Sequence, residues 1–343
     1  MNQPYDALLI VSFGGPEGMD QVMPFLENVL RVRNVPPERM REVAKHYELF
    51  GGVSPINEQN RQLIAALKRE LEANGPHLPI YWGNRNWHPL LADTLREMKT
   101  DGIKQALAFV TSAYSSYSSC RQYLENIAHA RELSGEDAPE VVKIRAFYNH
   151  PLFVEANAEN VRAALDTIPE ARRDSAQIVF TAHSIPDSMA VNCAYESQLL
   201  ETSRLVAERL GHGGWRLVYQ SRSGLPAQPW LGPDILEYLG ELEGAGSTDI
   251  VIAPIGFVSD HMEIIYDLDT EARQLAKELG MNMVRASTAG THPAFVKMIR
   301  ELILERTEGS AARFLGTREP SHDPCPATCC LSSSMERVGT TSR

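Results

Sequence analysis

The side chains best suited to acid–base or metal chemistry stand in two short segments of the chain. His183 follows the apolar run Ile178–Ala182 and begins a His-Ser-Ile-Pro turn, and Glu263 closes the segment Ser259–Glu263, which follows a second apolar run. Near neutral pH an imidazole serves as a general base or as a metal ligand, and a carboxylate does both as well. Because His183 alone is more typical of a structural histidine at a turn, the prediction of a site depends on its combination with Glu263.

Glu263, Asp267 and Glu271 form a row of carboxylates spaced four residues apart. On an α-helix this set drifts by about 40° per step, whereas a wider π-type turn aligns it better. Like charges at this spacing repel each other by roughly a few tenths of a kcal/mol per pair, and a bound divalent cation would relieve that repulsion. The alternative to a metal-binding row is a solvent-exposed acidic face at the start of a helix, where carboxylates are favoured in any case.

Apolar runs alternate with longer amphipathic stretches along the chain, which predicts an α/β protein with mostly parallel sheets flanked by helices. In such sheets, ligands bind beyond the carboxyl ends of the strands, where His183 and Glu263 are expected. The predicted strands are Ala7–Phe13, Ile80–Gly83, Gln105–Thr111, Val142–Phe147, Ile178–Ala182, Trp215–Gln220, Asp249–Phe257 and Met283–Ala286. The predicted helices include Pro55–Ala73, Pro151–Thr167, Glu196–Leu210 and Pro293–Arg306.

Composition and charge narrow the classes of function. The net charge of −11 argues against a nucleic-acid partner, because phosphate binding needs a basic surface. No apolar stretch reaches the roughly 18 residues that a membrane span requires, and the N-terminus lacks the features of a signal peptide, so we expect a cytoplasmic protein. No dinucleotide fingerprint, phosphate-binding loop or nucleophile elbow is present, so hydride transfer and phosphoryl transfer have no support.

The five cysteines are unevenly placed. Cys120 and Cys193 stand alone, while Cys325, Cys329 and Cys330 lie together in a tail that has lost helical periodicity. An odd number of cysteines in a cytoplasmic chain indicates metal binding or free thiols rather than a disulfide framework.

Six short motifs stand out along the chain. They are Phe-Gly-Gly-Pro (13–16), Gly-Gly-Val-Ser-Pro-Ile (51–56), Thr-Ala-His-Ser-Ile-Pro (181–186), Gln-Ser-Arg (220–222), Pro-Trp-Leu-Gly-Pro (229–233) and Gly-Phe-Val-Ser-Asp-His-Met-Glu (256–263). In order and spacing this set resembles the ferrochelatase family over residues 6 to about 306, and it looks most like the bacterial enzymes of actinobacterial type, including those that use coproporphyrin III. The resemblance implies two similar Rossmann-like lobes with an active-site cleft between them, at residues 1–148 and 149–306, followed by a cysteine-containing, partly disordered tail at 307–343.

The resemblance also implies roles for individual residues in haem biosynthesis. His183 and Glu263 would face each other across the cleft between the two halves and act on ferrous iron and the porphyrin, the two substrates, with the division of proton removal and metal delivery between them left open. Ser54 and Tyr123 match positions that contact the porphyrin, and the carboxylate row becomes an accessory path for metal or protons. Some relatives carry a tyrosine at the position of Phe13 that can bind the product iron, and Phe13 cannot do so.

The tail resembles the cysteine cluster with which many ferrochelatases hold a [2Fe–2S] centre, which needs four thiolates. Cys325, Cys329 and Cys330 supply three, and the fourth is expected to be Cys120, with Cys193 as the second choice. A structural zinc site and a tail with exposed thiols are the alternatives.

The sequence leaves three alternatives open, which concern the porphyrin, the metal and whether the protein catalyses a reaction. The reaction could use protoporphyrin IX in place of coproporphyrin III, or cobalt in place of iron, and a non-catalytic tetrapyrrole- or metal-binding protein of similar fold is a further alternative. We favour coproporphyrin III because the loop Leu26–Gly51 carries basic groups that suit a tetra-acid. They are Arg31, Arg33, Arg39, Arg41 and His46.

Overall fold

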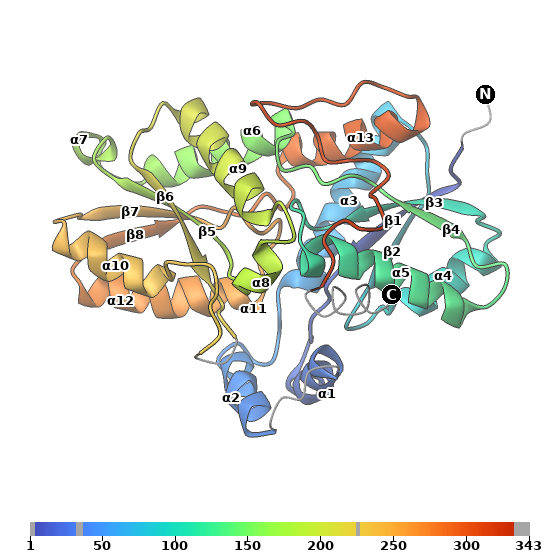
Figure 1. The fold of residues 1–343 in the computed structure, drawn as a ribbon, viewed down its shortest axis with the longest axis horizontal. Coiled ribbons are helices and arrows are strands. Elements are labelled where there is room, and N and C mark those ends of the chain that lie inside the picture. The colour runs from blue at the N-terminus through green and yellow to red at the C-terminus, as the bar shows by residue number, and fades with distance from the viewer. Residues whose placement is uncertain (1–3, 32–36, 224–226, 333–343) are drawn as a thin grey trace, which may run out of the picture.

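The computed structural model describes residues 4–31, 37–223 and 227–332 of the chain. Within these residues, eight strands form two four-stranded sheets in which every pairing is parallel. The first sheet has the order β2-β1-β3-β4 and the second β6-β5-β7-β8, so the second repeats the topology of the first. Figure 1 shows the two sheets side by side, with helices on both faces. The predicted architecture of two α/β lobes is confirmed. The strands are β1 (Ala7–Ser12), β2 (Ile80–Asn84), β3 (Gln105–Val110), β4 (Glu140–Lys143), β5 (Gln177–His183), β6 (Trp215–Gln220), β7 (Asp249–Ala253) and β8 (Asn282–Arg285).

The helices follow the predicted pattern, and two short π-helical segments, η1 and η2, interrupt it next to α5 and α12. The four helices predicted by residue range are present with shifts of at most two residues at either end. The helices are α1 (Met19–Leu30), α2 (Pro37–Glu48), α3 (Ile56–Asn74), α4 (Leu91–Thr100), η1 (Tyr117–Arg121), α5 (Gln122–Ser134), α6 (Pro151–Leu165), α7 (Glu170–Arg173), α8 (Asp187–Ala190), α9 (Tyr195–Leu210), α10 (Ile235–Gly244), α11 (Met262–Ile265), η2 (Asp267–Ala272), α12 (Arg273–Glu278) and α13 (Pro293–Thr307).

Two predicted strands have bounds that are wrong by two residues or more, whereas the other six agree with the structure within one residue at either end. The strand predicted at Val142–Phe147 is present as β4 over Glu140–Lys143, and Ile144, Ala146 and Phe147 are buried in irregular chain. An apolar run indicates that its side chains are buried, but it does not show whether the backbone forms a strand. The predicted strand was therefore extended over buried residues that have irregular backbone. The strand predicted to continue to Phe257 ends at Ala253, since Pro254 has no N–H to give to a neighbouring strand.

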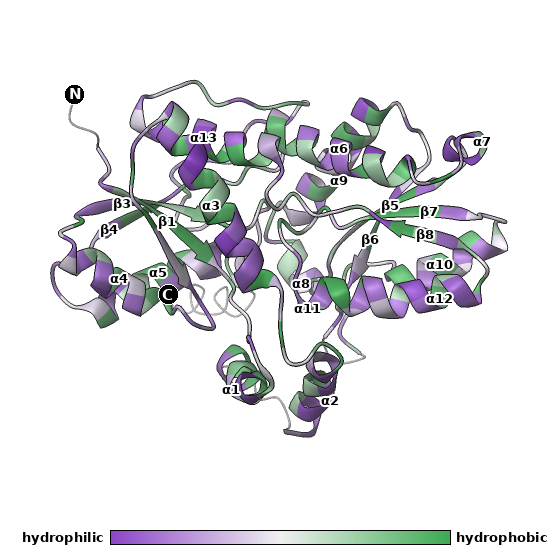
Figure 2. Cartoon of the chain, turned by 180° about the vertical axis from the view of Figure 1, so that it is seen from behind, coloured by the Kyte–Doolittle hydropathy of each residue, from purple (hydrophilic) through white to green (hydrophobic). Residues whose placement is uncertain are grey.

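The apolar core is continuous between the two lobes. Phe109 of β3 stacks on Phe147 with ring centroids 5.2 Å apart, and both rings contact Phe295 of α13. The same cluster of buried side chains includes Phe180 of β5, so residues of both sheets belong to it. Figure 2 shows the apolar residues concentrated in the strands and on the inward sides of the helices. The lobes therefore share a core rather than being joined only by a linker.

Helices α1 and α2 form a flap that leaves the first lobe after β1 and returns at Gly51–Ser54. Figure 1 shows the flap below both sheets. Phe25 and Tyr47 of the flap are buried in a small apolar cluster that also contains Met262 of α11, a residue of the second lobe. The segment expected to be a polar loop is thus mostly helical, and its apolar face contacts the second lobe.

Residues 308–332 run back across both lobes after α13, and we call this segment the strap (Figure 1). The Leu315 N–H donates to the Asn149 carbonyl over 2.9 Å, and the Glu201 carboxylate of α9 accepts from the Thr317 N–H over 3.3 Å. Farther along, the Arg121 guanidinium of η1 donates to three carbonyls of the strap. The described part of the tail is therefore held by both lobes, and residues 333–343 lie outside the described residues.

The domain bounds at 148/149 and 306/307 stay a prediction. In the described parts of the chain, no helix combines the length and the apolar character needed to cross a membrane. The cytoplasmic location and the absence of a nucleic-acid partner also stay predictions.

Candidate active site

His183 is the last residue of β5, at the carboxyl end of the second sheet. Its Nδ1 lies 2.5 Å from the Ser184 carbonyl oxygen, and its own carbonyl accepts a hydrogen bond from the Tyr195 hydroxyl over 3.0 Å. The Ser184 contact fixes a proton on Nδ1, because a carbonyl oxygen can only accept. The Nε2 atom is therefore the ring nitrogen available for chemistry.

Glu263 lies in α11, directly after the loop that follows β7. Its Oε1 lies 3.4 Å from Nε2 of His183, and its Oε2 lies 3.3 Å from Nε2 of His261. The Gln220 side chain, at the end of β6, donates to the Glu263 carbonyl over 2.6 Å. One carboxylate thus stands between two imidazoles, and the ends of three neighbouring strands position the group. The expectation that His183 and Glu263 face each other across a cleft between the two halves is wrong, because β5 and β7 are neighbours in the second sheet and bring both residues to the same lobe.

The electrostatics of this group favour an ion pair. Burial alone would lower the pKa of His183, but the Glu263 carboxylate outweighs it and raises that pKa to about 9. Burial would raise the pKa of Glu263, but His183 and then His261 hold it well below its ordinary value. The two side chains are 32% and 44% exposed, so the pair remains accessible. At neutral pH the pair is an imidazolium facing a carboxylate.

The carboxylate row continues from Glu263 into the π-helical segment η2, the wider turn that aligns this spacing best. The Ser221 hydroxyl donates to Asp267, and the Ser221 backbone has a positive φ of 62°. Burial, with Glu263 and Glu271 adding to it, raises the pKa of Asp267 to about 7. The pKa of Glu271 is also raised, mainly by burial, although the Tyr266 hydroxyl bond to it acts the other way. The row therefore contains a carboxyl group that exchanges a proton near neutral pH.

Asp260 does not belong to this row, although it stands in the same motif. Its two carboxylate oxygens accept from the Arg285 guanidinium over 3.2 and 3.1 Å, and Oδ1 also accepts from the Thr288 hydroxyl. Its backbone N–H donates over 2.7 Å to the side chain of Gln59 on α3, in the first lobe. Asp260 holds the loop between β7 and α11 in place.

The predicted porphyrin contacts lie in the first lobe. Ser54 and Tyr123 are 4% and 5% exposed. The Arg85 guanidinium lies over the ring of Tyr123 at 4.9 Å and over the ring of Phe13 at 5.6 Å. These aromatic rings and the guanidinium form one wall in the first lobe, and neither Ser54 nor Tyr123 hydrogen-bonds to His183.

The basic groups of the flap are partly paired. Arg39 and Arg41 form exposed ion pairs with Glu42 and Glu38 of their own helix. His46 stacks on Tyr266, and Arg33 lies outside the described residues. The flap therefore offers fewer free cations than its composition suggests.

The cysteines gather where the strap meets η1 and α8. The Cys120 thiol hydrogen-bonds to Cys325, which lowers the pKa of Cys325, and Cys325 also contacts Cys329. The Sγ atoms of Cys329 and Cys330 lie 3.5 Å apart. Cys120 and Cys330 are buried, and Cys330 is held at a positive φ of 53°.

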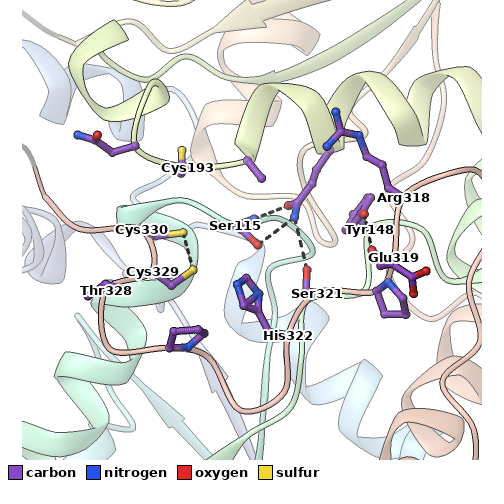
Figure 3. A pocket seen from close by; sticks show the side chains of 15 residues that line it. Ser115, Tyr148, Cys193, Arg318, Glu319, Ser321, His322, Thr328, Cys329 and Cys330 are labelled. Carbon is purple, nitrogen blue, oxygen red and sulfur yellow. Dashed lines mark hydrogen bonds between the residues drawn. The ribbon is translucent and has the colours of Figure 1, made fainter.

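A cavity of about 520 Å³ lies beside these thiols and away from His183. Cys193, Cys329 and Cys330 line it together with Gln198 and His322 (Figure 3). In residues 4–31, 37–223 and 227–332, no three histidine, cysteine or acidic side chains are arranged to hold a metal ion. The thiols contact one another in pairs, and the [2Fe–2S] centre stays a prediction.

Sequence reasoning missed three groups of the site. His261 was noted only as part of a motif, and its contact with the second oxygen of Glu263 depends on the bend before α11. Gln220 and Ser221 were quoted only within a motif, and their bonds to Glu263 and Asp267 join segments more than 40 residues apart in the chain. The available signal was their location at the carboxyl end of a predicted strand, with Gln220 as its last residue and Ser221 directly after it.

Known proteins resemble this chain over most of its length. The model of the ferrochelatase family matches residues 5–307. A ferrochelatase of Rhodopirellula baltica is 61% identical over 330 residues, covering 96% of this chain and 94% of the relative. A coproporphyrin III ferrochelatase of Streptomyces coelicolor is 51% identical over 350 residues, covering 95% and 93%.

Among solved structures, the sirohydrochlorin chelatase SirB of Bacillus subtilis subspecies spizizenii, in complex with cobalt, has a similar fold. The TM-score is 0.53 at 13% identity, and the match covers 88% of this chain and 95% of that one. At this identity the likeness concerns the fold alone, and it agrees with two lobes of chelatase type.

Proposed function

The chain belongs to the ferrochelatase family, whose reaction inserts ferrous iron into a porphyrin, and we propose that its porphyrin is coproporphyrin III and that His183 and Glu263 carry the reaction. The protein is thus a porphyrin metal chelatase of haem biosynthesis. The observation that carries the proposal is the shared carboxylate: Glu263 lies 3.4 Å from His183 and 3.3 Å from His261.

The chemistry requires two protons to leave the macrocycle for each iron that enters. At neutral pH the His183–Glu263 pair holds one proton, which must move on before Nε2 can accept a pyrrole proton or contact Fe²⁺. Asp267, with a pKa of about 7, takes up that proton and releases it to solvent through Glu271, so that Nε2 accepts the two pyrrole protons one after the other and passes each along the row. Glu263 then offers an anionic oxygen to the iron, since carboxylates are good ligands for Fe²⁺.

The remaining carboxylate and the lobe-1 wall have supporting roles. Glu271 lies farther along the row and passes protons or iron between solvent and Asp267. Ser54 and Tyr123 hold the porphyrin against Phe13, and the Arg85 guanidinium beside them supplies a positive charge for a propionate. The rigid packing of these rings supports bending of the macrocycle, which exposes its nitrogen lone pairs.

Single substitutions test the roles. His183→Ala and Glu263→Gln should lower anaerobic Fe²⁺ insertion, followed by stopped-flow absorbance, far more than Asp267→Asn or Glu271→Gln, while porphyrin binding survives. Glu132→Gln, an exposed carboxylate on α5, is the matched control and should match wild type. Near-normal turnover of His183→Ala or Glu263→Gln would remove that residue from the mechanism. Bound porphyrin without any metal insertion by wild type would favour a carrier.

The substrate proposal is supported by relatives about 50% identical that are named coproporphyrin III ferrochelatases. Each additional charge-assisted contact to a propionate contributes roughly 1.5–3 kcal/mol, so one such contact shifts selectivity by about tenfold or more. The ratio of kcat/KM for coproporphyrin III and protoporphyrin IX should therefore favour the former, with and without detergent. A preference for protoporphyrin IX in both conditions would overturn the substrate but not the chelatase activity.

We also propose that the tail cysteines hold a [2Fe–2S] centre. Four thiols, those of Cys120, Cys325, Cys329 and Cys330, form a chain of pairwise sulfur contacts, which supplies the number and kind of ligands that the centre needs. Because no three of them are arranged around a common point in the described residues, binding would turn their side chains toward one another. When bound, the centre would supply four iron–sulfur bonds that join the strap to η1. Arg121, the neighbour of Cys120, already holds the strap at the same place through its carbonyls.

Purified protein should then absorb visible light, and Cys120→Ser should bleach it while Cys193→Ser should not. Colour that is kept in Cys120→Ser and lost in Cys193→Ser would make Cys193 the fourth ligand. About one zinc per chain without sulfide would replace the centre by a zinc site.

A further inference from the structure

An aromatic contact that the mechanism above does not use joins the flap to the segment that carries the carboxylate row. The imidazole of His46, near the end of α2, stacks on the ring of Tyr266, which stands between α11 and η2. The ring centroids are 3.7 Å apart and the planes differ by 8°, so the two faces lie flat against each other. These residues are 220 positions apart in the chain and belong to different lobes.

Both partners of the stack are connected to the site. Tyr47, the neighbour of His46, is buried beside Glu263, whose charge adds to burial in raising the pKa of this tyrosine. On the other side, the Tyr266 hydroxyl hydrogen-bonds to the Glu271 carboxylate. A displacement of α2 would therefore change the surroundings of Glu263 at one end of the carboxylate row and of Glu271 at the other.

The surroundings of the stack indicate a contact that can separate. Burial, with the charge of Arg39, lowers the pKa of His46, so the ring is neutral at neutral pH and is not tied to the row by an ion pair. The apolar cluster beneath it consists of flap residues with Met262 of α11 among them, and Ile265 and Tyr266 are only partly buried against it. The flap thus rests on the second lobe through a few side chains, in contrast to the continuous core between the sheets.

We propose that His46 and Tyr266 are positioning residues that fasten the flap to η2 while a porphyrin is bound, and that their rings part when the macrocycle enters or leaves. The proposal rests on the proposed function for the identity of the ligand. The stack sets how long the porphyrin stays next to Glu263. While the flap contacts η2, the hydrogen bond from Tyr266 holds the Glu271 carboxylate in its position in the row.

The test compares removal of the stack with its replacement by another flat ring. His46→Ala and Tyr266→Leu abolish stacking, whereas His46→Phe and Tyr266→Phe retain it, and His129→Ala on α5 removes an exposed histidine outside the site. Dissociation of coproporphyrin III is followed without iron by its fluorescence, and hydrogen exchange of the α2 amides is measured in the free protein.

In His46→Ala and Tyr266→Leu the porphyrin should dissociate about tenfold faster, the effect of losing roughly 1.4 kcal/mol, and the α2 amides should exchange faster. His46→Phe, Tyr266→Phe and His129→Ala should stay close to wild type in both measurements. Rescue by the aromatic variants separates stacking from a general loss of structure.

Unchanged dissociation and unchanged α2 exchange in His46→Ala and Tyr266→Leu would overturn the proposal even if iron insertion is normal. If wild type binds no porphyrin, the proposed function fails, and the exchange measurement alone decides whether the stack holds the flap. Loss of both properties in His46→Phe as well would assign His46 to something other than stacking.

Discussion

His183 and Glu263 show how one pair of side chains can set the protonation state of a site. The imidazole would be neutral at pH 7 if burial acted alone, and the carboxylate opposite it reverses that preference. The carboxylate is in turn kept ionised by two imidazoles rather than one. The proton that must leave Nε2 of His183 before this atom can react is therefore held by the charge of Glu263. Removing that charge should make the proton easier to remove.

Glu263→Gln should lower the pKa of His183, which is about 9 in the wild type. Burial still disfavours the imidazolium in this variant, whereas the Glu263 charge that stabilises it is lost. Two-dimensional ¹H–¹⁵N spectra of the histidine side chains between pH 5 and 10 measure this directly. If neutral His183 is the reactive form, the rise of residual kcat/KM with pH should move to lower pH by the same amount. A His183 titration that is identical in both proteins would contradict the assigned ion pair.

Asp267 makes the opposite contribution, because its environment disfavours its charge. An ordinary aspartate ionises near 3.8, and folding raises this pKa to about 7. The stability associated with the protonated carboxyl is thus complete below pH 3.8 and is lost as the pH rises through about 7. The environment that raises the pKa of Asp267 therefore lowers the stability of the folded protein at neutral pH.

Asp267→Asn should therefore stabilise the protein at neutral pH and above. The gain should grow by roughly 1.4 kcal/mol per pH unit between about pH 4 and pH 7 and then level off. Urea unfolding of both proteins at pH 5, 6, 7 and 8 gives the comparison. A difference that does not depend on pH would show that Asp267 is ionised in the folded protein.

The elements around the site were predictable to different degrees, and the reasons are physical. Strands and long helices have strong periodicity, so β6 (Trp215–Gln220) was predicted with its observed bounds and α9 (Tyr195–Leu210) within one residue. The flap was mistaken for a loop because charged residues dominate α2, and only Ala44 and Tyr47 of that helix are buried. A narrow apolar face has a weak pattern in the sequence, and its partner, Met262, is more than 200 residues away.

The same limit applies to the site. The positions of His183 and Glu263 after apolar runs predicted that both lie at the carboxyl ends of strands, but not that the two strands are neighbours in one sheet, where the structure places the side chains 3.4 Å apart. Nothing in the spacing predicted that His261 rather than Asp260 would contact Glu263. That outcome depends on Arg285 of β8, which binds the Asp260 carboxylate through tertiary contacts. The four-residue spacing of the row indicated only that a π-type turn would align it better than a regular α-helix, and the structure has such a turn in η2.

Gly256 illustrates how an element can require one residue type. A methyl group at this position would lie 2.6 Å from the Cβ of Ala182, beside His183. The Gly256 N–H donates to the Thr181 carbonyl over 3.0 Å, so the segment after β7 cannot move away from β5 without losing this bond. Close contact between these two segments brings the His183 and Glu263 loops together.

Gly256→Ala should destabilise the protein by about 1–3 kcal/mol through overpacking, and it should lower turnover because the loops are pushed apart. Gly240→Ala is the matched control, since no atom lies within 4 Å of the added carbon in the middle of α10. That control should stabilise the helix by roughly 0.5–1 kcal/mol. Urea unfolding and the iron-insertion assay check both variants, and equal stability of the two would refute the close contact.

Across the whole molecule, the lobes are held together by a shared core and by buried charges at their junction. Arg145 and Glu305 are 2% and 9% exposed, and the guanidinium donates two bonds to the carboxylate, at 2.7 and 2.8 Å. The same guanidinium donates to the Arg313 carbonyl of the strap over 3.1 Å. The buried positive charge of Arg145, in the first half of the chain, is therefore neutralised by Glu305, which lies near the C-terminal end.

Arg145→Met should lower the free energy of unfolding by about 3–5 kcal/mol, because Glu305 is left buried without its partner. The double variant Arg145→Met/Glu305→Leu should recover most of this loss, since an apolar pair replaces the ion pair. Arg96→Met, which breaks the exposed pair with Asp93, should change stability by about 0.5 kcal/mol or less. Urea unfolding measures all three, and a single variant as stable as the Arg96 control would refute the role of the buried pair.

The strap has a consequence for how the protein is made. The Asn149 and Arg145 side chains acquire their partners from residues that lie 160 to 169 positions later in the chain. At a translation rate of about 5–20 residues per second, these groups wait roughly 10–30 s on the ribosome before their partners are synthesised. During this interval the nascent first lobe has its sheet but lacks α13 and the strap that cover the junction. Chaperones that bind exposed apolar chain should therefore recognise Phe147 and its neighbours in the nascent protein, and release them once the last helix has emerged.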